Sequence, residues 1–268
     1  MVSIDVMTQA AKKAGEFMKG SRDAESTEKT NRKDFVTVAD IKSQNILRDE
    51  LRAAYPDAVI LSEEDDESAR QALFADDFTG FVLDPIDGTY NFKRDMRESA
   101  ISIGYIEQGE SVAGVIYDPY KDELYSVTKG GGAFRNGEPI YVGDAQGVED
   151  ASITTSNSYD DAAMARNLRR HLAIYEQTGS MPWTNCVGSG VLIMAYVACG
   201  RFDVYHHNGL KPWDNAAGFL LVREAGGVVQ TLAGDEARFT SPTVLMGNPH
   251  IVTVLRDALG QADPELLT

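Results

Sequence analysis

The residues best suited to chemistry in this sequence are carboxylates, and the most informative ones lie in the segment Asp84-Pro85-Ile86-Asp87-Gly88-Thr89. An apolar stretch precedes this segment, and Pro85 fixes a turn without leaving a backbone N–H unpaired. Because Asp84 and Asp87 are three residues apart, a turn would bring both carboxylates to one point. There they repel each other unless they share a proton or a cation. Oxygen ligands of this kind favour Mg²⁺ or a similar hard ion.

The residues after Asp87 are suited to binding phosphate. If a helix starts at Gly88-Thr89, its free N–H groups would hold a phosphate, and Gly88 would let the backbone approach it closely. The hydroxyl of Thr89 could hold a water molecule. An Asp-rich turn that merely caps a helix explains the same spacing, and the local pattern leaves both interpretations open.

Further acidic positions also have two interpretations. Glu63 and Glu64 follow a predicted buried strand and open an acidic run that ends at Glu67. Functional residues of α/β folds lie at strand ends, which singles out Glu63, whereas the rest of the run is typical of a solvated loop. Asp214 and Asp40 each stand at the start of a predicted helix, where a carboxylate is either an N-cap or a functional group.

Composition limits the function classes. The 268 residues predict one or two domains, and a hydrophobic content of 43% with 25% charged residues excludes collagen-like, low-complexity and wholly disordered chains. The formal net charge of −16 disfavours nucleic acid and anionic membranes as partners and favours metal cations. The longest apolar run, Val191 to Cys199, is too short for a membrane span, and no signal peptide is recognisable. Two cysteines, expected as reduced core thiols, indicate the cytoplasm.

The elements that must position these residues differ between the two halves of the chain. An N-terminal helix, a helix ending near Ala54 and two short buried strands precede an antiparallel meander from Ala100 to Tyr141 with a hairpin at Asn136-Gly137. After residue 147, strand and helix patterns alternate up to Thr231. We therefore predict an α+β half over residues 1–147, which holds most of the candidate metal ligands, and an α/β half over residues 148–268, which holds Asp214.

Two of these motifs together resemble the paired signatures of the inositol monophosphatase family. They are the segment 84–89 with Asn91-Phe92, and Trp213-Asp214-Asn215-Ala216-Ala217-Gly218, in the family's order after Thr37…Asp40 and Glu63-Glu64. The resemblance extends from the N-terminal helix to Gly227. It implies a layered αβαβα sandwich, a homodimer, sensitivity to lithium, and two or three Mg²⁺ ions per subunit.

The resemblance also implies roles for individual residues. Asp84 would bridge two metal ions, Glu63 and the Ile86 carbonyl would complete the first, and Asp87 and Asp214 the second. Thr89 and Asp40 would act with Glu63 in catalysis by orienting a water molecule. Metal ions held in pairs can bind both the attacking and the leaving oxygen of a phosphate ester. The substrate-binding residues implied are Gly88, Thr89, Ser189, Gly190, His207 and Asp214. The resemblance thus implies that residues 148–268 carry the residues of substrate specificity.

The sequence departs from the family where the alcohol would bind. Relatives that cleave inositol phosphate usually have a glutamate seven residues before the Trp-Asp aspartate, and His207 stands there instead. A transition-metal site at His206-His207 is disfavoured because neighbours on a strand face opposite ways. His171 and His250 are expected at the surface.

We therefore expect a Mg²⁺-dependent phosphomonoesterase acting on a small polyol phosphate, first of all inositol monophosphate. The alternatives are the same chemistry on histidinol phosphate, fructose 1,6-bisphosphate or adenosine 3′,5′-bisphosphate, and a non-catalytic regulatory protein on this scaffold.

Overall fold

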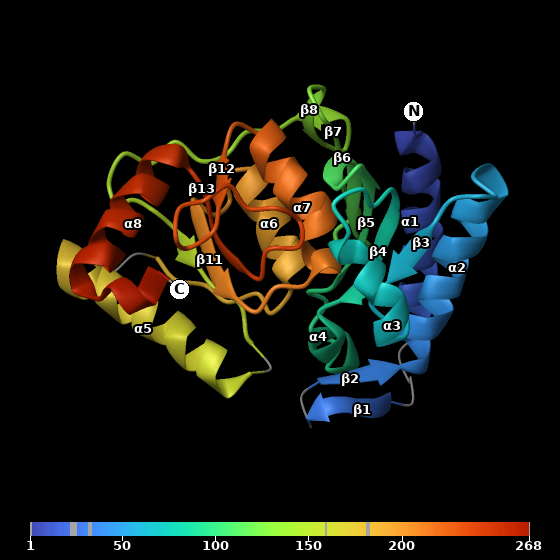
Figure 1. The fold of residues 1–268 in the computed structure, drawn as a ribbon, viewed down its shortest axis with the longest axis horizontal. Helices are drawn as coiled ribbons and strands as arrows, with labels where there is room; N and C mark the ends of the chain where they lie inside the picture. Colours follow the sequence, from blue (N-terminus) through green and yellow to red (C-terminus); the bar gives the residue numbers. More distant parts are fainter. Residues whose placement is uncertain (1, 22–25, 32–33, 159, 181–182, 268) are drawn as a thin grey trace.

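Three layers of helices and two β-sheets alternate through the molecule, as the computed structural model in Figure 1 shows. The structure describes residues 2–21, 26–31, 34–158, 160–180 and 183–267. The helices are α1 (Ile4–Gly20), α2 (Val38–Ala54), α3 (Glu67–Arg70), α4 (Thr89–Lys93), α5 (Asp161–Thr178), α6 (Gly190–Ala198), α7 (Pro212–Glu224) and α8 (Pro249–Ala262), with 3₁₀ turns at Gln71–Phe74 and Pro264–Leu267. The strands are β1 (Ser26–Asn31), β2 (Asp34–Thr37), β3 (Ile60–Ser62), β4 (Gly80–Asp87), β5 (Ala100–Glu107), β6 (Glu110–Asp118), β7 (Glu123–Thr128), β8 (Gly132–Arg135), β9 (Glu138–Pro139), β10 (Ile153–Thr154), β11 (Val204–Asn208), β12 (Val228–Gln230) and β13 (Thr243–Gly247).

The larger sheet has seven strands in sequence order from β3 to β9. β3 and β4 run parallel, and every later pair is antiparallel, so the meander predicted from the sequence is confirmed. The smaller sheet has the order β10-β11-β13-β12, with one parallel pair, β10 and β11. A separate hairpin pairs β1 with β2.

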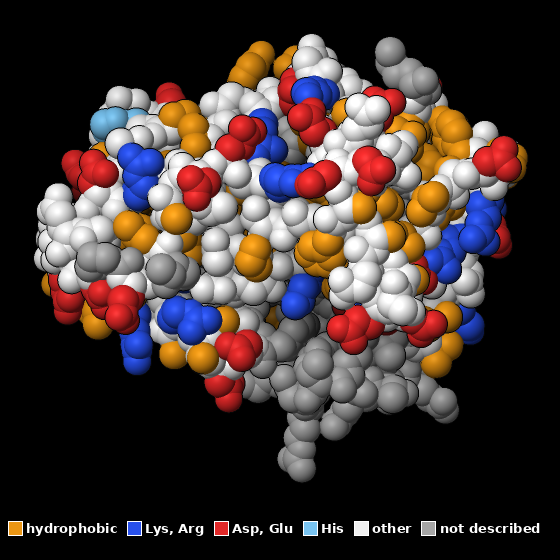
Figure 2. All heavy atoms as spheres, in the orientation of Figure 1, with side chains coloured by type: hydrophobic (Ala, Val, Ile, Leu, Met, Phe, Trp, Pro, Cys, Tyr) orange, Lys and Arg blue, Asp and Glu red, His pale blue; other side chains and the backbone are white. Residues whose placement is uncertain are grey.

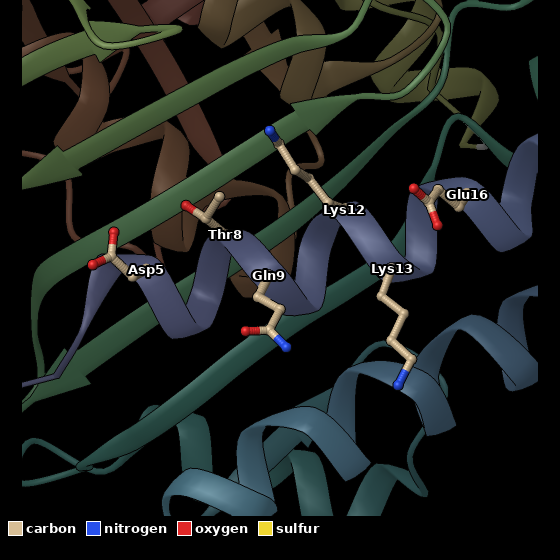
Figure 3. A pocket seen from close by; sticks show the side chains of 6 residues that line it. All are labelled: Asp5, Thr8, Gln9, Lys12, Lys13 and Glu16. Carbon is tan, nitrogen blue, oxygen red and sulfur yellow. The ribbon is translucent and has the colours of Figure 1, made fainter.

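Helices α1 and α2 cover the outer face of the large sheet. α1 is amphipathic: small and unbranched apolar residues such as Met7, Ala10 and Ala14 are buried against Leu47 of α2 and Phe81 of β4. Its opposite face, drawn in Figure 3, is polar and lines a shallow surface depression with Asp5, Thr8, Gln9, Lys12, Lys13 and Glu16. The depression mixes both signs of charge, and Lys13 pairs with Glu50 of α2.

Helices α6 and α7 lie between the two sheets. They are apolar all round, because one side packs on the large sheet and the other on the small one. Close packing of α7 depends on Gly104 of β5, where an added Cβ would come within 2.5 Å of the Ala216 Cβ. This contact fixes the height of the N-terminus of α7 above the large sheet.

Helices α5 and α8 cover the outer face of the small sheet. Ile174 of α5 and Leu255 of α8 are buried against Val204 and Leu245 of the sheet. The resulting order of layers is helix, sheet, helix, sheet, helix (Figure 1), which confirms the predicted αβαβα sandwich. The division into units at residues 147 and 148 stays a prediction.

Two helix starts differ from the local expectation that an aspartate would be the N-cap. The N-cap of α2 is Thr37, and Asp40 is the third helical residue, whose carboxylate accepts a hydrogen bond from the Thr37 N–H. In the same way Lys211 precedes α7, and Asp214 accepts a bond from the Lys211 N–H at 2.7 Å. An aspartate at the third helical position accepts from the N–H of the cap residue, a group that an N-cap side chain does not reach.

Several boundaries also differ from the sequence pattern. The expected strand from Phe202 to Tyr205 is instead Val204–Asn208, so both His206 and His207 belong to it. The hairpin at Asn136-Gly137 is present, but its second strand is Glu138–Pro139 rather than Ile140-Tyr141. The pattern also missed β13 and α8, which complete the smaller sheet and its cover.

The surface is charged without a single dominant patch on the face that Figure 2 shows, where Asp and Glu side chains are spread over both halves. Within the described ranges, none of the helices combines the length and apolarity that crossing a bilayer requires. Cys186 and Cys199 are unpaired as expected, but Cys186 is exposed and Cys199 half-buried, so neither is a core thiol.

Candidate metal centre

An irregularity in β4 brings Asp84 and Asp87 to the same side of the sheet. Asp84 is opposite Ser102 of β5 and Asp87 is opposite Ala100, so one extra residue is inserted in β4 between these pairs. In a regular strand, residues three apart face opposite sides, and the inserted residue restores a common direction. Pro85 lies in this bulge, where its missing N–H breaks no ladder bond.

The third carboxylate comes from the other half of the chain. Asp214 lies in the first turn of α7, a helix that packs against β4. Carboxylate oxygens of Asp84, Asp87 and Asp214 all lie within 4.8 Å of one another. A cation can therefore reach all three at once.

Burial and mutual repulsion disfavour the charged forms of these groups. Burial raises the pKa of Asp84 well above its usual value, and the charges of Glu63, Asp87 and Asp214 add to this effect. Burial likewise raises the pKa of Asp214, with Asp87 as the main like charge. Burial is also the largest cause that raises the pKa of Asp87 from 3.8 to about 6. A bound cation would offset the repulsion among these buried carboxylates. The three side chains offer only oxygen ligands, which suits a hard metal ion.

Helix α6 holds the Asp87 carboxylate in place. The hydroxyl of Ser189, the N-cap of α6, donates a hydrogen bond to Asp87 Oδ2, and the same Oδ2 accepts one from the Val191 N–H at 2.8 Å. The Ser189 hydroxyl also accepts the Leu192 N–H at 3.1 Å, so one hydroxyl caps the helix and orients the carboxylate. These donors partly offset the effect of burial on the pKa of Asp87.

Glu63 lies beside this trio without belonging to it. It follows β3, which is parallel to β4, and its N–H bonds the Leu83 carbonyl at 3.2 Å. Its charge raises the pKa of Asp84, Asp87 and Asp214, but its carboxylate is not among the oxygens that lie within 4.8 Å of one another. Asp65 in the same acidic run has a structural role, since it accepts from Arg48 and from the Ser62 N–H.

Thr89, Ile86 and Asp40 form a second polar group beside the trio. The Thr89 hydroxyl is 3.1 Å from the Ile86 carbonyl and 3.3 Å from Asp40 Oδ1. Asp40 is fully buried, and its other oxygen is held by Thr37. The structure thus brings together the residues to which the sequence assigned water orientation, and their catalytic roles stay a prediction.

Gly88 precedes α4 in a left-handed conformation, with φ of +82°. A Cβ there would approach the Glu98 carbonyl oxygen to 3.0 Å and the Ser189 Cβ to 3.2 Å. A helix does follow Gly88, but α4 has only five residues. Gly190 begins α6, where a Cβ would meet the Tyr205 hydroxyl at an ordinary 3.5 Å.

His207 is a buried residue of β11, and its ring contacts Asn167 of α5. Its Nδ1 is 3.1 Å from Asn167 Nδ2 and 3.2 Å from Ser156 Oγ. His206 has a different neighbour, His171, whose ring centroid is 4.6 Å away. The expectation that His171 lies at the surface without a companion was therefore wrong, because α5 carries it against β11.

Some residues of the site were not identified from the sequence. Val191 contributes a backbone N–H, which a helix start at Ser189 could have indicated, since the first N–H groups of a helix have no internal partner. Asn91 links the region to the loop before α6 by donating to the Val187 and Glu98 carbonyls, both at 2.8 Å. Asn167 comes from α5, and no local pattern distinguishes it.

Comparison with known proteins gives a consistent result. Residues 2–261 match the sequence model of the inositol monophosphatase family. The chain is 34% identical over 264 residues to an inositol-1-monophosphatase of Rhizobium meliloti, with 97% of each chain covered. It is 31% identical over 271 residues to the Nus factor SuhB of Escherichia coli K12, again with 97% of each covered. The crystal structure of the extragenic suppressor protein suhB from Bartonella henselae superposes with a TM-score of 0.85 at 34% identity, covering 96% of this chain and 97% of that one.

Proposed function

The chain belongs to the inositol monophosphatase family and is a phosphoric monoester hydrolase, and from this premise we propose that its substrate is a small polyol phosphate, first of all inositol monophosphate. The observation that carries the proposal is the convergence of Asp84, Asp87 and Asp214 within 4.8 Å. The substrate is taken from the name of the Rhizobium meliloti relative.

We propose Mg²⁺ as the metal, two or three ions per subunit. Asp84, Asp87, Asp214, Glu63 and the Ile86 carbonyl offer only oxygen atoms, which suits a hard ion and not a soft one. When bound, such ions supply a water molecule of lowered pKa and neutralise charge on the phosphate.

The protein groups around the metal ions would have three different roles in catalysis. Asp87, held by Ser189 and Val191, and Asp214, held by the Lys211 N–H, keep their oxygens fixed before substrate arrives. Thr89 and Asp40 would accept or donate the hydrogen bonds that aim the attacking water. Backbone N–H groups after Gly88 would contact phosphate oxygens. Positioning of this kind provides most of the catalysis in phosphoryl transfer.

The test is phosphate release from a panel that contains inositol monophosphate, histidinol phosphate, fructose 1,6-bisphosphate and adenosine 3′,5′-bisphosphate, with Mg²⁺ and with a chelator. We expect release that requires Mg²⁺ and is highest with inositol monophosphate. A clear preference for another ester would leave the proposed phosphate hydrolysis standing but would reject inositol monophosphate as the substrate. Full turnover in the presence of the chelator would reject the proposal that catalysis depends on Mg²⁺.

A second candidate is a regulatory role in addition to catalysis, because relatives 31% identical are named Nus factors. This function would reside in a protein-binding surface, so it should survive Asp87→Asn. Co-purification of the variant and the native chain with the same partner from native extract, followed by identification of that partner, would test it.

We further propose a homodimer in the cytoplasm. Leu168, Leu172 and Tyr175 recur on one face of α5 and are 54%, 54% and 44% exposed. Apolar side chains gathered in this way mark contact surfaces. Light scattering of the native chain and of Leu172→Glu should give a dimer and a monomer respectively.

A further inference from the structure

Two arginines hold the turn that carries Glu63. The turn runs from Ser62 to Asp65 and is closed by a hydrogen bond from the Asp65 N–H to the Ser62 carbonyl at 3.1 Å. On one side, Arg48 of α2 bonds the Asp65 carboxylate. On the other side, Arg70, the last residue of α3, donates from NH1 to the Glu63 carbonyl at 2.8 Å. The position of Glu63 therefore depends on two helices outside β3.

Arg70 also contacts the segment that carries Asp214. Its guanidinium carbon lies 5.1 Å from the centroid of the Trp213 ring. Trp213 directly precedes Asp214 in α7, and its ring packs against a buried apolar cluster that includes Leu61 of β3. One side chain thus connects the turn of Glu63 to the first turn of α7.

The two contacts of Arg70 require a flat cation with several donors. A guanidinium stacks its face on an indole ring while an N–H at its edge donates to a carbonyl oxygen. A lysine would keep the charge and a donor but has no flat face. Arg70 and Trp213 are both half-buried, so the surrounding side chains limit their freedom to separate.

The backbone of Glu63 is anchored on both sides. Its N–H bonds the Leu83 carbonyl, next to Asp84, and its carbonyl accepts from Arg70. The carboxylate lies near the trio, because its charge is the largest like charge that adds to burial in raising the pKa of Asp84. One peptide group of Glu63 is therefore fixed to β4, and the next is fixed through Arg70 to the start of α7.

We propose that Arg70 is a positioning residue that bonds the Glu63 carbonyl and stacks on Trp213, and so holds the Glu63 carboxylate at the metal centre. The inference rests on the proposed function, because it takes Glu63 as a ligand of Mg²⁺. Arg70 acts in this role through Glu63 and not by contact with the substrate.

Charge and positioning predict opposite effects for Arg70→Gln. Loss of a positive charge beside a cation site should by itself tighten Mg²⁺ binding. Loss of the support for Glu63 should weaken Mg²⁺ binding by about tenfold, as is usual for residues that orient metal ligands. Calorimetric titration of the full-length, metal-free protein with Mg²⁺ decides between them. We expect weaker binding, and equal or tighter binding would overturn the proposal.

A double-mutant cycle tests whether the effect passes through Glu63. In the Glu63→Gln background the charged ligand is already lost, so adding Arg70→Gln should weaken Mg²⁺ binding by no more than about twofold further. A second full loss of affinity on that background would show that Arg70 acts elsewhere, and it too would overturn the proposal.

Arg201→Gln is the matched control. Arg201 makes the same kinds of contact, with its guanidinium carbon 5.0 Å from the Tyr196 ring centroid and a bond to Glu123. It follows the C-terminal end of α6, whereas Ser189 caps the other end. Arg201→Gln should lower the free energy of unfolding without changing Mg²⁺ affinity. An equal loss of affinity in this variant and in Arg70→Gln would mean general destabilisation and would reject positioning.

The contact between Arg70 and Trp213 has an optical test that needs no metal. In Trp183→Phe, Trp213 is the sole tryptophan of the chain. Acrylamide should quench its fluorescence more strongly when Arg70→Gln is added, because one face of the indole ring is then uncovered. Unchanged quenching would reject the stack and with it the proposal.

Failure of the proposed function gives a different pattern. A native chain that neither binds Mg²⁺ nor releases phosphate from any ester would reject the proposed function and the role of Arg70 together. A native chain that does both, with unchanged Mg²⁺ affinity in Arg70→Gln, would reject the role of Arg70 alone.

Discussion

The hydroxyl of Ser189 donates a hydrogen bond to Asp87 Oδ2 across 102 residues of sequence, from the start of a buried helix to the end of a buried strand. The same hydroxyl accepts the Leu192 N–H and so caps α6. Helix capping and orientation of a carboxylate therefore depend on one atom. Stability and metal binding are expected to change together when this atom is removed.

Ser189→Ala should lower the free energy of unfolding by about 1 kcal/mol through loss of the cap. It should also weaken the apparent affinity for Mg²⁺ by about 10- to 100-fold, because outer partners of metal ligands have effects of that size. Urea unfolding and a Mg²⁺ titration of phosphate release measure the two effects. Ser3→Ala, which removes the cap of α1, is the control and should change stability only. Equal Mg²⁺ affinity in both variants would contradict the role of Ser189.

Asp87→Asn should separate activity from stability. The amide oxygen can still accept from Ser189 and Val191, but one charge of the cluster is lost. Phosphate release should fall by more than about 100-fold, whereas the Tm of the metal-free protein should rise by about 5 °C because repulsion is relieved. Calorimetry in a chelator and a phosphate assay measure both. A lower Tm in the variant would argue against a repulsive cluster.

In the metal-free protein, the converging carboxylates should oppose folding less as the medium is acidified from pH 7.5 to pH 5. Buried His206 and His207, whose pKa values are lowered, act in the opposite sense, so the carboxylate contribution is measured as a difference between the native chain and Asp87→Asn. The pKa of Asp87 is about 6 in the folded protein and 3.8 as the reference value, so the folded state binds more protons between these values. Above pH 6, ionised Asp87 lowers the free energy of unfolding by up to about 3 kcal/mol. This destabilisation decreases as the pH falls through the pKa of Asp87 in the folded protein.

The raised pKa values of Asp84 and Asp214 add to this slope in the same sense. Thermal unfolding at several pH values in a chelator measures how the carboxylate contribution to stability changes with pH. Saturating Mg²⁺ should remove this pH dependence. The stability of the native chain relative to that of Asp87→Asn should rise on acidification over this range. A difference between the two chains that does not change with pH would refute the prediction.

Gly88→Ala should destabilise the protein and reduce activity, because φ is +82° and the new Cβ would meet the Glu98 carbonyl at 3.0 Å. Gly137→Ala has nearly the same φ, +84°, but no atom within 4 Å of its Cβ. It should show the backbone cost alone, about 1 kcal/mol, with normal activity. The difference in unfolding free energy between the variants measures the cost of contact at Gly88. Identical behaviour would mean that Gly88 is needed only for its φ.

The layers of the fold were more accessible from the sequence than the ends of its elements. Strands of the large sheet alternate in polarity or precede clear turns, and the hairpin at Asn136-Gly137 has its own local signal. The sequence of strand β13 has no such signal. The strand lies between β11 and β12 in the small sheet, and its sequence is only a short apolar run, which does not distinguish a strand from a buried helix.

The carboxylates were identified from the sequence, but their convergence was explained there by a turn and in the structure arises from a strand bulge at Pro85. The residue types in a strand do not show whether that strand contains one residue more than the neighbouring strand with which it pairs. The orientation of His207 was not predictable either, since it is set by Asn167, which lies 40 residues away on another element.

The separation of Asp84 and Asp87 from Asp214 in the sequence has a consequence for biosynthesis. A nascent chain that has emerged only as far as α6 holds two of the three acidic groups and lacks the helix that carries the last one. Ion capture by the complete trio can therefore start only late in translation, after residue 214 has left the ribosome, and premature termination before that point would yield a fragment without it.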